Sequence, residues 1–184
     1  MLHGEYVLAV GVPLLIALAV LRRRRGVAPS RVALESAFGL YALLLLMVVL
    51  FPLRVSAGLR ADKAVWDYAT FLRDWFNLMP FATIRQVMER APQQALRQLG
   101  GNLVLLAPLG FLVPALYPRF RRAGAMIALS VTVALGIEFI QYLARVARLS
   151  LRSVDVDDAM LNIAGALVGF LVWVIWSRFR ARSR

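Results

Sequence analysis

The sequence predicts an all-α fold: an integral membrane helical bundle of about five transmembrane helices, with a short amphipathic interfacial helix in the outer loop. Three observations predict it. Of the 184 residues, 61% are hydrophobic, against roughly 45–50% in typical soluble domains. Five apolar runs approach the length of about 20 residues that crosses a bilayer. The arginines cluster at the ends of these runs, as they do in membrane proteins.

The apolar runs follow one another along the whole chain. They are residues 6–21, 32–51, 102–117, 123–144 and 159–176. The run at 102–117 is short and contains Pro108 and Pro114, so a re-entrant hairpin is the alternative to a full span there. Proline is tolerated inside membrane bundles because neighbouring helices satisfy the freed backbone groups.

Three arginine clusters orient the predicted bundle. Residues 22–31, 119–122 and 178–184 contain basic and no acidic residues, whereas the loops at 52–101 and 145–158 mix both signs. Two spans separate successive clusters, so all three lie on one side, which the positive-inside rule makes cytoplasmic. We therefore expect an outside N-terminus and a cytoplasmic C-terminus. The net charge of +12 is explained by this topology, and no nucleic-acid partner is expected.

The long outer loop contains an amphipathic segment. Apolar side chains recur at three- or four-residue spacing from Val65 to Met79, which predicts a helix on the outer leaflet; a plain connecting loop is the alternative. The expected interfacial residues are Trp66, Trp75, Phe76, Pro80 and Phe81.

The loop should then lead into the third span in two steps. Pro80 should end the interfacial helix, and Thr83 with Gln86 fits a capping box for a second short helix, which Pro92 interrupts. Gly100–Gly101 should turn the chain into the span at 102–117.

Polar residues of the last two spans are the candidates for function. Glu138 and Gln141 are three residues apart and share a helix face, either as a structural pair between helices or as part of a site. Asp155, Asp158 and Asn162 share a face as the last span begins, and Gly165 and Gly169 continue that stripe. Asp157 points elsewhere, and an acidic first turn also suits a helix N-terminus.

All of these residues should lie near the external membrane face. The candidate cluster is Asn102, Glu138, Gln141, Arg152, Asp155, Asp157, Asp158 and Asn162. Such a cluster fits an ion-paired lock, a binding pocket or a divalent-cation site, although the acidic triplet lacks the glycine and distant glutamate of an EF-hand. The chain has no cysteine and one histidine, His3, which removes thiolate nucleophiles and structural zinc sites. No metal, cofactor or catalytic residue is assigned.

Four segments, taken in order, resemble a known family. They are Asn77–Ile84 (NLMPFATI), Asn102–Pro114 (NLVLLAPLGFLVP), Glu138–Gln141 (EFIQ) and Arg152–Gly165 (RSVDVDDAMLNIAG). Their order, spacing and topology are similar to those of the VanZ-like family, named for a teicoplanin-resistance accessory protein. Ala166 departs from an expected second glycine but is also small. The resemblance implies one VanZ-like membrane domain over 1–184. Its core is about 38–176, with an extra N-terminal span and basic loop at 1–31 and a basic cytoplasmic tail at 177–184.

The resemblance also implies a multi-pass protein of the bacterial cytoplasmic (inner) membrane. The expected function is non-enzymatic: binding or shielding an amphiphilic or lipid-linked molecule at the outer face, with an effect on susceptibility to lipoglycopeptides such as teicoplanin. Its expected partners are the lipid bilayer and a lipid-linked cell-wall precursor or lipoglycopeptide. One alternative is a membrane enzyme acting on a lipid-linked substrate, with Glu138 or an aspartate as general base. A second alternative is a small proton-coupled transporter.

Overall fold

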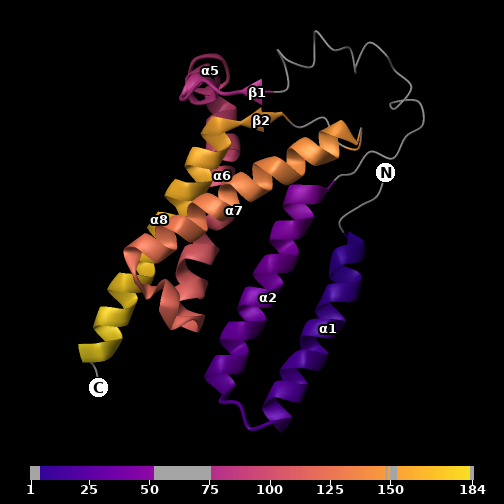
Figure 1. The fold of residues 1–184 in the computed structure, drawn as a ribbon, viewed down its shortest axis with the longest axis vertical. Helices are drawn as coiled ribbons and strands as arrows, with labels where there is room; N and C mark the ends of the chain where they lie inside the picture. The colour runs from indigo at the N-terminus through magenta and orange to yellow at the C-terminus, as the bar shows by residue number, and fades with distance from the viewer. Residues whose placement is uncertain (1–4, 52–75, 148, 150–152, 183–184) are drawn as a thin grey trace.

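The computed structural model describes residues 5–51, 76–147, 149 and 153–182 (Figure 1). Across these ranges, five helices are long and apolar enough to cross a membrane: α1 (Glu5–Arg24), α2 (Pro29–Leu50), α6 (Pro92–Leu116), α7 (Ala123–Val146) and α8 (Val156–Arg182). They confirm the predicted all-α membrane bundle. The shorter elements are β1 (Phe76–Asn77), α5 (Ala82–Arg90), the 3-10 turn η1 (Pro118–Arg121) and β2 (Val154–Asp155).

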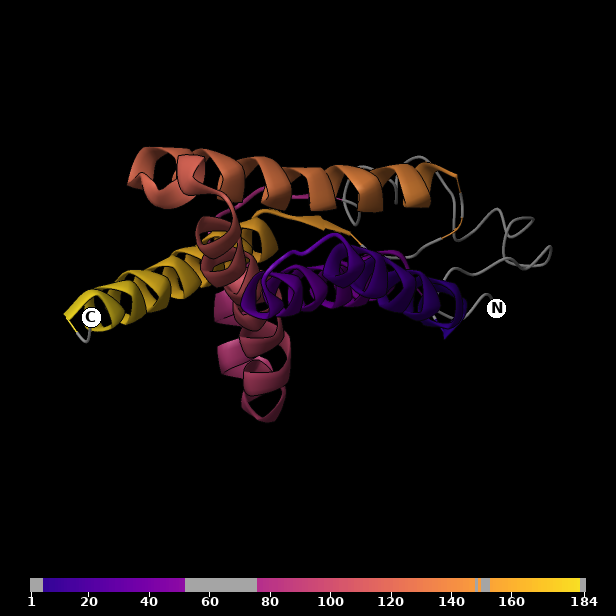
Figure 2. The same cartoon turned by 90° about the horizontal axis from the view of Figure 1, so that it is seen from below.

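The two ends of the bundle differ in character. The α1–α2 turn, η1 and the C-terminal end of α8 lie toward one end (the lower part of Figure 1), and these are the arginine-rich segments. The short strands and α5 lie toward the opposite end, where α6 and α8 begin. Figure 2, seen from below, shows α7 on one side of the crossing pair α6 and α8, with α1 and α2 side by side. We call the end with α5, β1 and β2 the polar end.

Helices α6 and α8 meet with their backbones in close contact. A Cβ atom on Gly165 would lie 1.7 Å from the carbonyl oxygen of Leu103, and one on Gly169 would lie 1.9 Å from that of Ala107. Gly110 of α6 faces the backbone of Ala166 in the same way. The glycine stripe at 165 and 169 therefore faces a neighbouring helix, because only small residues permit this approach.

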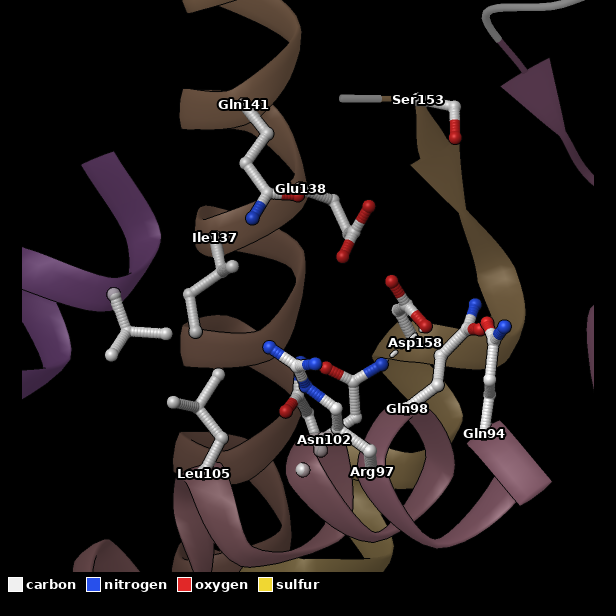
Figure 3. Close-up of a pocket in the computed structure, with 13 residues that line it drawn as sticks. Gln94, Arg97, Gln98, Asn102, Leu105, Ile137, Glu138, Gln141, Ser153 and Asp158 are labelled. Carbon is white, nitrogen blue, oxygen red and sulfur yellow. Dashed lines mark hydrogen bonds between the residues drawn. The ribbon is translucent and has the colours of Figure 1, made fainter. Parts of the chain in front are cut away.

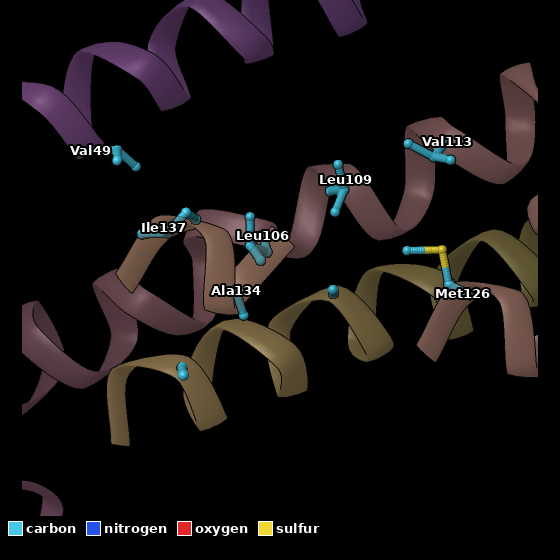
Figure 4. Close-up of a cluster of buried hydrophobic side chains, with 9 residues drawn as sticks. Val49, Leu106, Leu109, Val113, Met126, Ala134 and Ile137 are labelled. Carbon is cyan, nitrogen blue, oxygen red and sulfur yellow. The ribbon is translucent and has the colours of Figure 1, made fainter. Parts of the chain in front are cut away.

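The buried apolar core lies where α6, α7 and α8 cross. Leu106 and Met126 are fully buried there, and Leu109, Val113 and Ile137 pack around them (Figure 4). Many apolar side chains elsewhere on the long helices are exposed. Lipid tails are as apolar as these side chains, so the exposed helix faces fit a bilayer.

Helix α1 packs beside α2 and has no buried residue. Gly11 lies against Leu43, and Gly39 of α2 lies against Leu15. At the arginine-rich end the Arg22 guanidinium donates two hydrogen bonds to the Glu35 carboxylate, at 2.7 and 3.0 Å. The only acidic residue of α2 is thus paired where the helix begins.

Arginines also bind the C-terminal end of α6. Arg31 donates to the Leu116 carbonyl at 2.9 Å, and Arg121 donates to the Pro114 carbonyl at 3.2 Å. The last carbonyls of a helix lack intrahelical partners, and the negative end of the helix dipole favours cations. Arginines of these clusters therefore have a structural role at the end of α6.

Helix α6 differs from the predicted third span. It begins at Pro92 and continues without a break through Gly100–Gly101, Pro108 and Pro114 to Leu116. The expected turn at Gly100–Gly101 is wrong, and the segment is one helix rather than a re-entrant hairpin. Pro92 is at its first position, where proline needs no N–H partner. Ten residues that were predicted to lie in a loop therefore extend this helix at the polar end.

Candidate functional site

A polar clamp joins two segments that lie far apart in the sequence. Strand β1 pairs in parallel with β2, with Phe76 opposite Val154 and Asn77 opposite Asp155. The Asp155 carboxylate accepts hydrogen bonds from the Asn77 side chain at 3.1 Å and from the Thr83 hydroxyl at 2.6 Å. We call residues 76–84 and 154–157, joined in this way, the polar clamp.

Asp157 is the centre of this clamp. Its fully buried carboxylate accepts hydrogen bonds from the backbone N–H groups of Phe81, at 2.5 Å, and Ile84, at 3.1 Å. These N–H groups belong to the start of α5, whose first turn has no intrahelical partners for them. A negative charge is also favourable at a helix N-terminus. Asp157 thus caps a helix that lies more than 70 residues earlier in the chain.

The expected capping box of α5 is therefore wrong. The helix begins at Ala82, and its N-cap residue Phe81 makes no side-chain hydrogen bond. The Thr83 hydroxyl is directed to Asp155 instead of to the helix backbone. Phe81 has a left-handed backbone, with φ of 66°, a conformation that is uncommon for a bulky residue. The contacts with Asp157 stabilise this turn.

A pocket of about 760 Å³ lies beside the clamp (Figure 3). It is enclosed mainly by α6, α7 and the start of α8, with one residue from α2 and one preceding β2. Its lining residues are Val48, Gln94, Arg97, Gln98, Gly101, Asn102, Leu105, Ile137, Glu138, Gln141, Ser153, Asp158 and Asn162. Side-chain amides, two carboxylates and one guanidinium thus surround a space that also has an aliphatic wall.

One face of helix α6 lines this pocket. Gln94, Arg97, Gln98, Gly101, Asn102 and Leu105 follow the three- and four-residue spacing of one helix face. The prediction included only Asn102 from this row. The periodicity was present in the sequence, but the expected turn at Gly100–Gly101 divided it, so Gln94, Arg97 and Gln98 were missed.

Helix α7 contributes the pair that was predicted to share a face. Glu138 and Gln141 are both buried and both line the pocket. The Glu138 carboxylate accepts a hydrogen bond from the backbone N–H of Asp155 at 3.0 Å. One wall of the pocket is therefore bound directly to the polar clamp, so that movement of the clamp would move Glu138.

Helix α8 contributes Asp158 and Asn162. The Asn102 side chain donates to the Asp158 carboxylate, which links α6 to α8 across the pocket floor (Figure 3). Asn162 is 1% exposed, and its side-chain oxygen has no hydrogen-bond partner among the residues that the structure describes. Buried acceptors are nearly always hydrogen-bonded, so this oxygen is an exception among the buried polar atoms of the site.

The residues of the predicted polar cluster are divided between the pocket and the polar clamp. Asn102, Glu138, Gln141, Asp158 and Asn162 line the pocket, whereas Asp155 and Asp157 form the clamp. The expected common face of Asp155, Asp158 and Asn162 is wrong for its first member, because Asp155 lies in β2, before α8 begins. Arg152 lies outside the described residues. Within the described ranges, no three acidic or histidine side chains are grouped as in a metal site.

The predicted interfacial residues are only partly described. Trp66 and Trp75 lie outside the described residues, and residues 76–79 form β1 and a bend instead of the end of a helix. Phe76 is half-buried, with its ring 5.7 Å from that of Tyr142. Pro80 is exposed, and around it Leu78, Met79 and Phe81 are 68%, 74% and 54% exposed. The clamp thus presents an apolar tip at the polar end.

Comparison with known proteins agrees with these features. A family model described as VanZ/LLP1 matches residues 38–177. This range contains every pocket residue and the whole polar clamp, and it excludes α1 and the start of α2. No curated protein and no solved structure matches this chain significantly.

Proposed function

This chain belongs to the VanZ/LLP1 family, and from that premise we propose that it is a non-enzymatic protein of the bacterial cell envelope. We propose that it binds an amphiphilic molecule in the pocket at its polar end. The head group of the molecule binds the amides and charges of the pocket, and its hydrocarbon chain lies along the apolar wall. The family resemblance to a teicoplanin-resistance protein supports a lipid-linked cell-wall precursor or a lipid-tailed glycopeptide as the ligand.

The two-sided lining of the pocket is the observation that carries this proposal. Val48, Leu105 and Ile137 form an apolar wall, opposite the polar residues of α6, α7 and α8. An amphiphile has the same division between chain and head group. Asn162 adds a buried acceptor without a partner in the described structure, and leaving such a group unsatisfied costs about 1–3 kcal/mol. A ligand N–H or O–H group would recover that free energy if the pocket wall moved enough to expose this oxygen.

We propose that this pocket lies at the outer face of the membrane. The arginine clusters are at the opposite end of the bundle, and the positive-inside rule assigns them to the cytoplasm. A pocket at the outer end is accessible to envelope precursors and to antibiotics that arrive from outside. Binding there would shield the precursor or sequester the antibiotic.

The exposed apolar tip of the clamp supports the same location. Leu78, Met79 and Phe81 lie beside the start of α5, and apolar and aromatic side chains of this kind enter the interfacial region of a bilayer. Contact with the outer leaflet would hold the clamp at the membrane surface, next to the head groups from which the ligand is taken. Trp66 and Trp75 are proposed to add to this contact.

Filling the pocket tests the proposal. A Cβ atom on Gly101 meets nothing within 4 Å, although Gly101 lines the pocket. Gly101→Leu should therefore leave the fold intact and lower binding of a purified lipid-linked cell-wall precursor at least tenfold, as measured by native mass spectrometry. Gly136→Leu is the matched control, because Gly136 also has open space, lies within α7 and does not line the pocket.

The same experiment distinguishes the alternatives. Saturable binding without chemical change supports a binding protein, whereas conversion of the precursor would identify an enzyme with Glu138 or Asp158 as the general base. Equal binding by Gly101→Leu and the wild type would exclude the pocket as the binding site.

A further inference from the structure

The arginine-rich end of the bundle has exposed guanidinium groups on two elements. Three arginines lie in or directly after η1, and three lie in the last two turns of α8. They are Arg119, Arg121, Arg122, Arg178, Arg180 and Arg182, and all are exposed. Residues 117–123 and 174–182 contain no acidic residue. The charged side chains that these two segments contribute to the surface are therefore all positive.

Two of these guanidinium groups lie over neighbouring tryptophan rings of α8. The guanidinium carbon of Arg121 is 5.9 Å from the centre of the Trp173 ring, and that of Arg180 is 5.0 Å from the centre of the Trp176 ring. Trp173 and Trp176 are three residues apart, so they lie on the same side of the helix. Arg121 comes from η1 and Arg180 from α8. The two rings thus hold charges from both elements at one side of the end of α8.

This arrangement leaves guanidinium donors for an anion. A guanidinium has five N–H donors in its plane, and contact with an aromatic face uses none of them. Arg121 donates one hydrogen bond to the Pro114 carbonyl, at 3.2 Å, which fixes its direction. Among the described residues, no carboxylate forms an ion pair with Arg121 or Arg180. Fixed planar donors of this kind match the oxygens of a phosphate group.

An apolar surface of α8 leads to these donors. Val168, Val172 and Trp176 are 50%, 51% and 41% exposed, and they precede Arg180 at four-residue intervals, along one face of the helix. An acyl chain can lie along this face while its phosphate group reaches the arginines at the helix end. The surface therefore matches both parts of a phospholipid, and its charge matches one whose head group is negative.

We propose that an anionic phospholipid binds at this end, with its phosphate at Arg121 and Arg180 and an acyl chain along Val168, Val172 and Trp176. Basic sites at the ends of membrane helices bind anionic lipid head groups. An ethanolamine phospholipid fits less well, because its ammonium would lie among arginines of the same sign. This site is separate from the pocket, whose lining residues belong to the polar end.

A comparison of two lipids with identical acyl chains tests the proposal. The full chain in detergent micelles is titrated with phosphatidylglycerol and with phosphatidylethanolamine, and bound lipid is measured by native mass spectrometry. Phosphatidylglycerol should bind at least tenfold more tightly. Excess inorganic phosphate should not displace it, because phosphate lacks the acyl chain. Equal affinities for the two lipids, or displacement by inorganic phosphate, would overturn the proposal.

Variants with matched loss of charge locate the site. Arg121→Gln and Arg180→Gln should each weaken phosphatidylglycerol binding about fivefold, the effect of one arginine beside an anionic lipid surface. Arg24→Gln and Arg25→Gln are the controls, because these exposed arginines lie at the same end of the bundle but at the end of α1. An equal loss in the control variants would show an effect of net charge and would overturn the site.

Two further variants exclude indirect effects. Arg121→Gln also removes the hydrogen bond to Pro114, so the thermal unfolding midpoint of each variant is measured without added lipid. Arg180→Lys keeps the charge and loses the planar donors, and it should still weaken binding. Gly101→Leu, which fills the pocket at the polar end, should leave phosphatidylglycerol binding unchanged. Loss of binding in Gly101→Leu would place the lipid in the pocket and would contradict this separate site.

Discussion

At the scale of single residues, the polar end depends on carboxylates that bind backbone groups of other elements. Asp157 binds the first N–H groups of α5, and Glu138 binds the N–H of Asp155. These bonds connect α5, β2 and α7 at the polar end. The acidic residues near position 155 are therefore divided between a structural role and the pocket, although they are adjacent in sequence.

Replacing Asp157 by alanine should release the start of α5. Two buried N–H groups would lose their acceptor, which should cost about 1–3 kcal/mol of stability. Amide hydrogen exchange at Phe81 and Ile84 should accelerate at least tenfold, while the exchange of α8 amides beyond its first turn stays unchanged. Glu89→Ala, on the exposed side of α5, is the control. Unchanged exchange at Phe81 and Ile84 would show that Asp157 does not stabilise this turn.

At the scale of elements, the close contact of α6 and α8 positions the two sides of the pocket. Gly165 and Gly169 face the α6 backbone three and seven residues after Asn162. The distance between Asn102 on α6 and Asp158 on α8 is therefore set by helix packing that lies about two to three turns after Asp158. Any separation of this pair of helices would widen the pocket.

Gly165→Ala should separate the pair. The added Cβ would lie 1.7 Å from the Leu103 carbonyl oxygen, so the helices must move apart, at a cost of about 1–3 kcal/mol. The thermal unfolding midpoint in detergent should fall by several degrees. Gly136→Ala has no neighbour within 4 Å and should be neutral or slightly stabilising. Equal midpoints for the two variants would contradict the close contact.

The order and identity of the long helices could be predicted from the sequence, whereas the pocket face of α6 could not. Hydropathy and the arginine clusters are strong signals because lipid and charge act on whole segments. Gly100–Gly101 was interpreted as a turn because glycine costs a helix about 1 kcal/mol in water. In α6 that cost is offset by packing and by the need to hydrogen-bond the backbone near lipid. Gln94, Arg97 and Gln98 were missed for this reason.

The contacts of Asp157 could not be predicted either. Its partners are backbone N–H groups of residues 81 and 84, and backbone groups leave no signature in the sequence. Hydrophilic residues at the start of α8 were identified as a group, but only the fold determines which of them turn toward α5 and which line the pocket.

At the scale of the whole molecule, the two ends of the bundle differ in the residues that they contain and in the contacts that these residues make. The arginine-rich end binds its own helix termini and the carboxylate of Glu35. The polar end presents the pocket and the apolar tip. In the proposed positive-inside orientation, this asymmetry would direct the pocket outward and keep the arginines in the cytoplasm. The extra helix α1 packs along α2 and contributes no residue to the pocket lining.

The orientation can be measured directly because the chain has no cysteine. Single cysteines at exposed positions, Arg90→Cys on α5 and Arg25→Cys after α1, report the two ends. A membrane-impermeant maleimide should label Arg90→Cys in right-side-out vesicles and Arg25→Cys only in inside-out vesicles. The reverse pattern would invert the topology and with it the location of the pocket.

The central claim, that an amphiphile binds in the pocket at the outer face, is tested most directly by photocrosslinking in vesicles. Diazirine-bearing analogues of the lipid-linked precursor and of a lipid-tailed glycopeptide are irradiated with the protein, and the crosslinked residues are mapped by mass spectrometry. We predict that one analogue crosslinks at Asn102, Gln141 and Asn162, and that Gly101→Leu but not Gly136→Leu removes these crosslinks. Crosslinks spread evenly over the exposed apolar faces, and unchanged in Gly101→Leu, would contradict the claim.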